Sequence, residues 1–346
     1  MRAKNLDHLS SDHINLKQSG VTMADLRSMK KLQMAVQAAR LYYGCDESQA
    51  RIALKLKISR PQVSRLLQLA REQGIVTIHV NNPPGVHTAL EQLFVDYFGI
   101  KHAVIVPLST SNRETIKQKL AAIAADYIYE IVEGDQIIGL PWGSTLNYVA
   151  AYLKPKDLPG TTVVQLKGGV CRISGNYDTQ NPVLTFARKL GGTPCLLPVP
   201  SIVEDEKVKK ALLKDERIKE ILNLGERAEI AVFSIGIPGE GSVLVRAGYF
   251  TGSEMLDLQS RGAVGDICSR YFTIDGKIFD PQLNARTIGI ELEQLKRKKY
   301  AIAVAGGVDR ARGILGALRG GYINVLITDE DAAREVLRLA GIPEKQ

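Results

Sequence analysis

Short apolar strands alternate with amphipathic helices along residues 86–346, and this alternation limits the possible folds more than any other feature of the chain. Runs that suit strands lie at 103–106, 136–140, 162–166, 230–235, 301–305 and 324–328. Runs with helical spacing lie at 87–98, 114–132, 145–153, 181–190, 206–223, 253–261, 309–319 and 329–340. Strands separated by helices form mostly parallel sheets, because each crossover helix covers one face of the sheet. The pattern predicts a doubly wound α/β domain.

Residues 24–80 have a different pattern, which predicts a smaller helical domain. Apolar residues recur at helical spacing from 25 to 43, and two shorter helices follow. Ser59 can cap the helix at 60–73, and Pro61 falls in its first turn, where a missing N–H costs little. The turn residue Lys57 has to adopt a left-handed conformation at some cost. The spacing indicates a helix-turn-helix, and the alternation at 75–80 predicts a strand after it, as in a winged helix.

The face that the helix at 60–73 leaves outside is polar and basic. Arg60, Gln62, Ser64 and Arg65 donate to phosphates and base edges. Residues 1–80 hold thirteen Lys and Arg against six Asp and Glu, so they carry a net charge of +7 and the rest of the chain is nearly balanced. An ordinary helical hairpin in a core would also fit the apolar spacing. The charge favours a polyanion partner, and we predict operator DNA.

The length of 346 residues suggests two domains. We expect a mobile arm at 1–23, a helix-turn-helix domain at 24–80, a linker at 81–85 and an effector and oligomerisation domain at 86–346. No apolar run is long enough to span a bilayer, and the N-terminus lacks the apolar stretch of a signal peptide. Four scattered cysteines fit reduced thiols, so we expect a cytoplasmic protein with neither a metal site nor a cofactor.

Several strand ends are rich in glycine and polar residues, and ligands of such sheets bind at the carboxyl ends of the strands. Helix N-termini there bind anions through free N–H groups. The candidate ligand-binding residues are Gly143, Ser144, Thr145, Lys167, Gly168, Gly169, Gly306, Gly307 and Arg310. Any one of these loops could owe its glycines to turn geometry, but together they point to a small phosphorylated ligand.

Lys167 has three interpretations, and the sequence leaves them open. It can be a solvated lysine at a strand end, a contact to a phosphate or hydroxyl, or an amine that forms a Schiff base with an open-chain aldose.

Ordered motifs at 49–74, 139–146, 265–276, 286–290, 302–307 and 316–330 carry a resemblance to a known family. The chain resembles the SorC family of bacterial transcription regulators, also called the SorC/DeoR type. The resemblance implies an N-terminal helix-turn-helix and an effector domain similar to phosphosugar isomerases and deaminases. It also implies a homo-oligomer, often a tetramer, that binds an operator and responds to a phosphorylated sugar.

Carried over by position, the resemblance assigns the effector phosphate to Gly143, Ser144, Thr145, Gly306, Gly307 and Arg310. It places the sugar near Lys167, Gly168 and Gly169, with Gly265 and Asp266 on a neighbouring loop. It also implies that a lysine at position 167 can form a Schiff base, as in members that respond to deoxyribose phosphate.

The predicted function is therefore regulation of a carbohydrate-utilisation operon through an approximately palindromic operator. The alternative is a phosphosugar isomerase or deaminase with an appended helical domain, in which Asp266, Asp309 or Glu240 would serve as acid or base. The net positive charge of residues 1–80 argues against an enzyme. So does the lack of a histidine–carboxylate pair in the loops. The identity of the sugar, and whether the protein represses or activates, stay open.

Overall fold

The computed structural model describes residues 23–76, 88–108, 110–169 and 182–343. The chain divides into two compact units, residues 1–81 and 82–346. The predicted arm (except Met23), linker and most of the predicted wing strand fall outside the described residues. No helix in the described ranges is long and apolar enough to cross a membrane.

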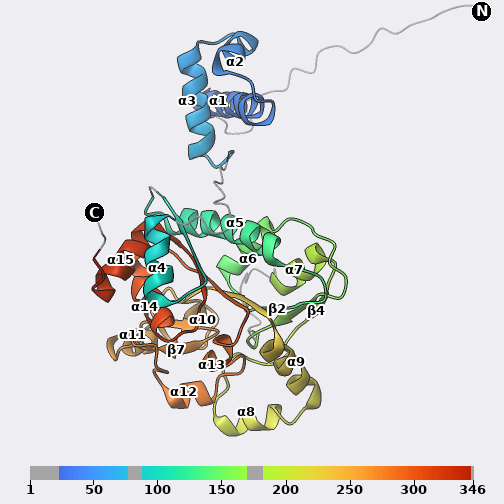
Figure 1. Ribbon diagram of the computed structural model, residues 1–346, viewed down its shortest axis with the longest axis vertical. Helices are drawn as coiled ribbons and strands as arrows, with labels where there is room; N and C mark the ends of the chain where they lie inside the picture. The colour runs from blue at the N-terminus through green and yellow to red at the C-terminus, as the bar shows by residue number, and fades with distance from the viewer. Residues whose placement is uncertain (1–22, 77–87, 109, 170–181, 344–346) are drawn as a thin grey trace, which may run out of the picture. The chain divides into compact units, whose positions relative to one another are not determined.

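The first unit is a bundle of three helices around a small core (Figure 1). Its elements are α1 (Met23–Ala39), a π-helical turn (Arg40–Gly44), α2 (Gln49–Leu56) and α3 (Arg60–Glu72). The buried core side chains are Ala35, Ala38, Ala39, Ile52, Val63, Leu66, Leu67 and Ala70. They come from the apolar positions of all three helices, so each helix stabilises the other two.

The turn between α2 and α3 has the local structure that the sequence predicts. Lys57 is left-handed, with a φ of 54°. Ser59 caps α3, because its side chain accepts a hydrogen bond from the backbone N–H of Gln62. The backbone N–H of Ser59 in turn donates to Oε1 of Gln62 at 2.8 Å, which completes a capping box. This reciprocal pair fixes where α3 begins.

The second unit is built on a seven-stranded sheet in the order β1-β9-β8-β5-β2-β3-β4, and every neighbouring pair in it is parallel. Its strands are β1 (His102–Val106), β2 (Ile137–Leu140), β3 (Thr162–Gln165), β4 (Thr193–Cys195), β5 (Ile230–Phe233), β8 (Tyr300–Val304) and β9 (Val325–Asp329). The helices that follow the predicted pattern are α4 (Ala89–Phe98), α5 (Arg113–Ile131), α6 (Ser144–Tyr152), α7 (Pro182–Leu190), α11 (Gly252–Ser260), α14 (Ala311–Arg319) and α15 (Glu330–Ala340).

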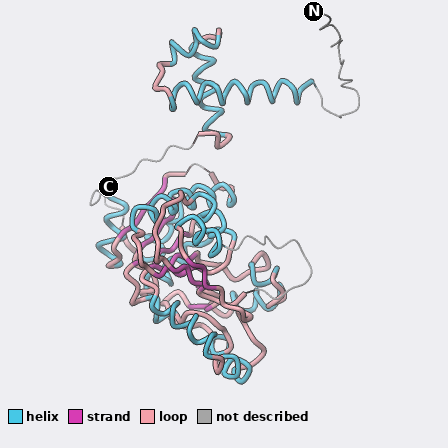
Figure 2. Tube along the Cα trace, turned by 90° about the vertical axis from the view of Figure 1, so that its right-hand side faces the viewer, coloured by secondary structure: helices cyan, strands magenta, loops and turns pink. Residues whose placement is uncertain are grey.

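Helices cover both faces of this sheet, as Figure 2 shows for the strands in magenta. In β5, Ile230 and Val232 pack with α5, α6 and α7 on one face, whereas Ala231 and Phe233 pack with α4, α14 and α15 on the other. This alternation follows from the two-residue period of a strand. The doubly wound α/β fold is confirmed.

Several short elements differ from the predicted pattern. The single helix expected at 206–223 is two helices, α8 (Glu206–Leu212) and α9 (Glu216–Arg227), because Asp215 caps the start of α9. Strand β4 and the hairpin β6 (Gly265–Ile267) with β7 (Arg270–Phe272) were not predicted. Strands of three residues are too short to show an alternating pattern. The remaining short helices are α10 (Val243–Arg246), α12 (Pro281–Ala285), α13 (Leu292–Leu295) and the 3-10 turn η2 (Val308–Arg310).

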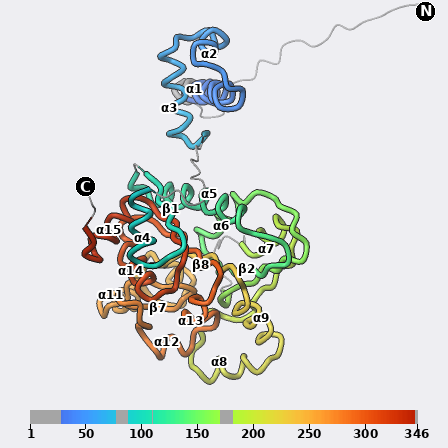
Figure 3. The backbone as a smooth tube through the Cα atoms, in the orientation of Figure 1, coloured from blue at the N-terminus to red at the C-terminus, as the bar shows by residue number. Residues whose placement is uncertain are grey.

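The order of the strands reverses between β2 and β5. From β2 the chain passes to β3 and β4 on one side, and β5, β8 and β9 then follow on the other side of β2. Figure 3 labels β1, β2 and β8 along the chain. Ligands of doubly wound sheets bind in the crevice at such a reversal, outside the carboxyl ends of the strands.

Candidate functional site

Four glycine-rich segments, at 139–146, 167–169, 236–242 and 306–310, follow four adjacent strands of the sheet. They come after β8, β5, β2 and β3, which are neighbours in that order. Because these strands are parallel, their carboxyl ends lie at one edge. The fold therefore brings the predicted ligand-binding segments together at the reversal of strand order.

The segment after β2 ends in the N-terminus of α6. Gly143 is the N-cap residue, Ser144 begins the helix and Thr145 is buried in its first turn. The side chain of Lys117, from α5, donates to Oγ of Ser144 at 3.5 Å. The first N–H groups of a helix have no partner within the helix and attract anions. Lys117 is also paired with Glu114 at 3.1 Å, so a cation and a carboxylate both lie beside this helix start.

The segment after β8 forms a second turn of this kind. The backbone N–H of Gly307 donates to Oδ2 of Asp329 at 2.6 Å. Nη1 of Arg310 donates to the carbonyl of Gly306 at 3.0 Å, and its Nε donates to the carbonyl of Ile235, after β5, at 3.3 Å. Burial lowers the pKa of Arg310. The guanidinium thus joins two neighbouring strand ends.

Two cations near the start of α5, which were not predicted from the sequence, lie beside these turns. Arg113 pairs with Asp309 at 2.5 Å, beside Arg310, and Lys117 contacts Ser144. Cations are unfavourable in the first turn of a helix, because the helix dipole is positive there. A basic residue at the start of the helix after β1 is a signal that could have indicated an anion-binding edge.

Lys167 is buried, with 4% of its surface exposed. Its Nζ lies 3.7 Å from the centre of the Trp142 ring and 3.5 Å from Oγ of Ser269. Burial lowers the pKa of Lys167, and the negative charge of Asp266 opposes that shift. The solvated interpretation of Lys167 is therefore wrong. A buried lysine with a depressed pKa has a larger neutral fraction, which is the nucleophilic form.

The two glycines after Lys167 present carbonyl groups that other residues hold in place. The carbonyl of Gly168 accepts hydrogen bonds from Nε1 of Trp142, at 2.6 Å, and from the hydroxyl of Ser201. The carbonyl of Gly169 accepts from the hydroxyl of Tyr249 at 2.7 Å. Trp142, Ser201 and Tyr249 were not among the predicted site residues, because nothing in their local sequence links them to Lys167.

Asp266 lies in strand β6, whereas the family resemblance placed it on a loop. The strand pairs with β7, and Oδ2 of Asp266 accepts from the backbone N–H of Ser269 at 3.1 Å in the tight turn between them. Burial raises the pKa of Asp266, and the charge of Lys167 opposes that shift. A partly buried acid and a buried amine thus interact at the same site.

The four predicted DNA-binding side chains, of Arg60, Gln62, Ser64 and Arg65, are exposed on α3. The capping box uses the amide oxygen of Gln62, which accepts from both the backbone N–H and the hydroxyl of Ser59. A base contact by Gln62 would therefore have to come from its amide nitrogen.

No group of three or more His, Cys, Asp and Glu side chains in the described ranges could hold a metal ion. The cysteines there, Cys45, Cys195 and Cys268, are free thiols, and burial raises the pKa of Cys268 to about 12.

A three-helix unit followed by a doubly wound domain, with helix starts at its reversal of strand order, defines a class of two-part α/β proteins. Residues 83–338 match the model of the Sugar-bind family, described as "Putative sugar-binding domain". The chain is 40% identical over 308 residues to the deoxyribonucleoside regulator of Bacillus subtilis, which covers 89% of this chain and 98% of that protein. The chain belongs to the Sugar-bind family and is a transcriptional regulator of the SorC/DeoR type.

A second relative and a solved structure agree with this assignment. The sorbitol operon regulator of Klebsiella pneumoniae is 30% identical over 309 residues, 89% of this chain and 98% of that protein. The crystal structure of the full-length sorbitol operon regulator SorC from that organism matches with a TM-score of 0.68 and 30% identity, over 88% of this chain and 98% of that one. The predicted family is confirmed.

Proposed function

We propose that this regulator binds operator DNA through α3 and that a phosphorylated sugar at the carboxyl edge of the sheet controls its affinity for the operator. The observation that carries the proposal is the convergence of two helix starts, Arg310 and Lys167 at the reversal of strand order. The helix starts suit a phosphate and the lysine suits the sugar.

The phosphate binds between the turns at Ser144 and Gly307. The turn at Ser144 offers backbone N–H groups at the start of a helix, and the cations Arg310, Arg113 and Lys117 lie around the two turns. Charge-assisted hydrogen bonds to a phosphate are about twice as strong as neutral ones. An unphosphorylated sugar therefore binds much more weakly.

The sugar end lies at Lys167, where an aldehyde can react with the amine. The neutral amine attacks the aldehyde carbon, and the carbonyl oxygen leaves as water while the C=N bond forms. The relative named as a deoxyribonucleoside regulator makes 2-deoxyribose 5-phosphate the first aldose phosphate to test. A ketose or an alditol phosphate would use Lys167 as a hydrogen-bond donor instead.

On the DNA side, Arg60, Gln62, Ser64 and Arg65 face the major groove. Two copies of α3 in a homo-oligomer, which we propose to be a tetramer, read the halves of an approximately palindromic operator. A bidentate arginine–guanine pair contributes about 1–3 kcal/mol of discrimination. We place this activity in the cytoplasm, where the operator and phosphorylated sugars occur together.

In vitro selection from a pool of random duplexes tests the DNA part of the proposal. The wild-type protein should select one sequence with related halves, and Arg65→Ala should lose preference at one base pair in each half while still binding DNA. Arg71→Ala, at the other end of α3, is the matched control and should keep the preference. A selected sequence that is identical for wild type and Arg65→Ala would refute the assignment of Arg65.

The enzyme alternative is tested separately. Relatives named as regulators favour a protein that does not turn over its ligand. Isomerisation or deamination of a sugar phosphate by the purified protein, followed by NMR, would show the opposite.

A further inference from the structure

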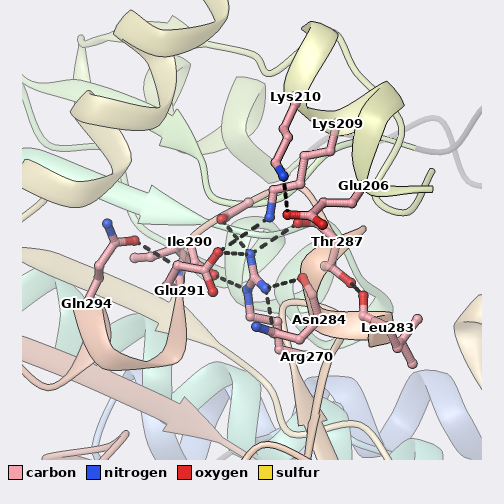
Figure 4. Close-up of polar contacts among 11 residues, drawn as sticks. Glu206, Lys209, Lys210, Arg270, Leu283, Asn284, Thr287, Ile290, Glu291 and Gln294 are labelled. Carbon is pink, nitrogen blue, oxygen red and sulfur yellow. Dashed lines mark hydrogen bonds and ion pairs between the residues drawn. The ribbon is translucent and has the colours of Figure 1, made fainter. Parts of the chain in front are cut away.

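Arg270, in β7, is the largest fully buried side chain in the described ranges, with 1% of its surface exposed. Its nitrogens donate to four backbone carbonyls, to an amide oxygen and to a carboxylate. The acceptors are the carbonyls of Asn284, Thr287, Gly289 and Ile290, Oδ1 of Asn284 and Oε1 of Glu291. Figure 4 shows this guanidinium in the middle of its acceptors.

Burial of a cation costs desolvation free energy, and apolar residues of similar size often stabilise a protein as well or better. A guanidinium can, however, fix the positions of several oxygen atoms at once, because its N–H donors lie in one plane and point in fixed directions. Here it holds the consecutive carbonyls of Gly289 and Ile290, at 3.0 and 2.7 Å, so it fixes the path of that segment.

The segment that Arg270 holds lies directly against Lys167. The backbone N–H of Gly168 donates to the carbonyl of Ile288 at 3.0 Å, and that of Ile290 donates to the carbonyl of Leu166 at 2.7 Å. Gly289 has a φ of +152°, and a Cβ there would lie 2.8 Å from Cα of Lys167. The contact is too close for any residue but glycine.

Arg270 is also the residue directly after Ser269, whose hydroxyl contacts the Lys167 amine. Ser269 directly precedes it, has a φ of 67° and places its hydroxyl 3.5 Å from Nζ of Lys167. The side chain of Arg270 thus holds the segment beside the backbone of Lys167, and its backbone holds the serine beside the amine. Two of the contacts of Lys167, with the segment at Gly289 and with Ser269, thus depend on Arg270.

We propose that Arg270 is a positioning residue that sets where the Lys167 amine meets the sugar. This inference rests on the proposed function, in which Lys167 contacts the sugar end of the effector.

The carboxylate partner of Arg270 extends the network toward the surface. Glu291 pairs with Arg270 at 2.7 Å and with Lys209, in α8, at 3.6 Å, and its side chain is 43% exposed. Glu291→Gln removes the negative charge that pairs with Arg270, but its amide oxygen can still accept the hydrogen bond from Nη2, so the hold on the segment weakens and no buried donor loses its acceptor. It is the mild variant if substitutions of Arg270 itself prevent folding.

The first test follows the reaction of Lys167 with an amine-selective acetylating reagent in the full chain, as a function of pH, by mass spectrometry. Arg270→Met should loosen both contacts and admit water, so the midpoint for Lys167 should rise toward that of an ordinary lysine. Arg270→Lys should restore part of the shift, and Glu291→Gln should give a smaller shift in the same direction. Lys298→Met is the matched control, since the Lys298 amine is another buried cation that donates to backbone carbonyls, those of Gly225 and Glu226.

The second test compares two ligands on the same variants. Affinity for 2-deoxyribose 5-phosphate should fall about ten- to a hundredfold in Arg270→Met, as displacements of about 1 Å can cost that much. Affinity for inorganic phosphate, which the helix starts bind, should stay unchanged.

A folded Arg270→Met with the wild-type labelling profile and wild-type affinities would overturn the inference, as would an equal loss for both ligands. If wild-type protein binds neither ligand, the proposed function is wrong, while the labelling profile still decides whether Arg270 positions Lys167.

Discussion

The chemistry of this site depends most on one amine. Lys167 is buried against the Trp142 ring, and the charge of Asp266 opposes the loss of its proton. The ordinary lysine pKa is about 10.4. Since burial lowers the pKa of Lys167, its neutral fraction at any given pH exceeds that of a surface lysine.

The lowered pKa predicts how the reaction of Lys167 with an aldose depends on pH. Trapping of an aldose phosphate on Lys167 with borohydride should increase with pH, with a midpoint below the ordinary lysine value. The charge of Asp266 raises the pKa of Lys167, so Asp266→Asn should move that midpoint further down. The trapped adduct is measured by mass spectrometry, and Lys167→Arg, which cannot form it, is the control. A midpoint that moves up in Asp266→Asn would contradict this view of the pair.

Ser59 caps α3 from the position before its first residue, whereas Ser64 lies inside α3. Ser59→Ala removes the cap of α3 and should lower the free energy of unfolding of the first unit by about 0.5–2 kcal/mol. Ser64→Ala, at an exposed position inside α3, is the matched control and should change it little. Thermal unfolding followed by circular dichroism measures both. Equal losses in the two variants would show that the capping box does not stabilise α3.

At the scale of elements, the sequence predicted the long helices from their helical spacing of apolar residues. It predicted the strands of the sheet because strands that are buried on both faces are short, continuous apolar runs. It did not predict β6 and β7. Their turn uses Cys268 and Ser269 at φ values of 53° and 67°, and neither residue type indicates a left-handed turn. The break between α8 and α9 was missed for a related reason, since the apolar spacing continues across it.

The sequence predicted those residues of the candidate site that lie just after the ends of strands. Gly143, Ser144, Gly307 and Lys167 lie at the edge that the parallel sheet implies. The partners that hold them, such as Trp142, Ser201 and Arg270, reach the site through contacts between distant segments. No local pattern contains that information.

The turn after β8 gives a prediction at this scale. Gly307 has a φ of +94° and donates its N–H to Asp329, so Gly307→Ala strains the turn beside Arg310. We expect weaker binding of inorganic phosphate, measured by calorimetry. Gly321→Ala is the matched control, because Gly321 is also left-handed, with a φ of +67°, but follows α14. Phosphate affinity that falls equally in both variants would mean that Gly307 acts only through stability.

At the scale of the whole molecule, control of operator affinity by an effector requires coupling between the two units. If the effector changes operator affinity a hundredfold, the coupling free energy is about 2.7 kcal/mol, and the operator must change effector affinity by the same factor. Titration of 2-deoxyribose 5-phosphate with and without the selected duplex measures this reciprocity. Equal effector affinities in the two titrations would rule out regulation by this ligand.

The central claim is that the second unit binds a phosphorylated sugar. Its most direct test is the thermal unfolding of the wild-type protein with a panel of sugar phosphates, each paired with its unphosphorylated sugar. A ligand at a hundred times its Kd stabilises the folded state by about 2.7 kcal/mol. We predict a clear rise in melting temperature with one phosphate, 2-deoxyribose 5-phosphate first among them, and none with its parent sugar. Equal shifts with a phosphate and its parent sugar, or no shift with any phosphate, would contradict the account.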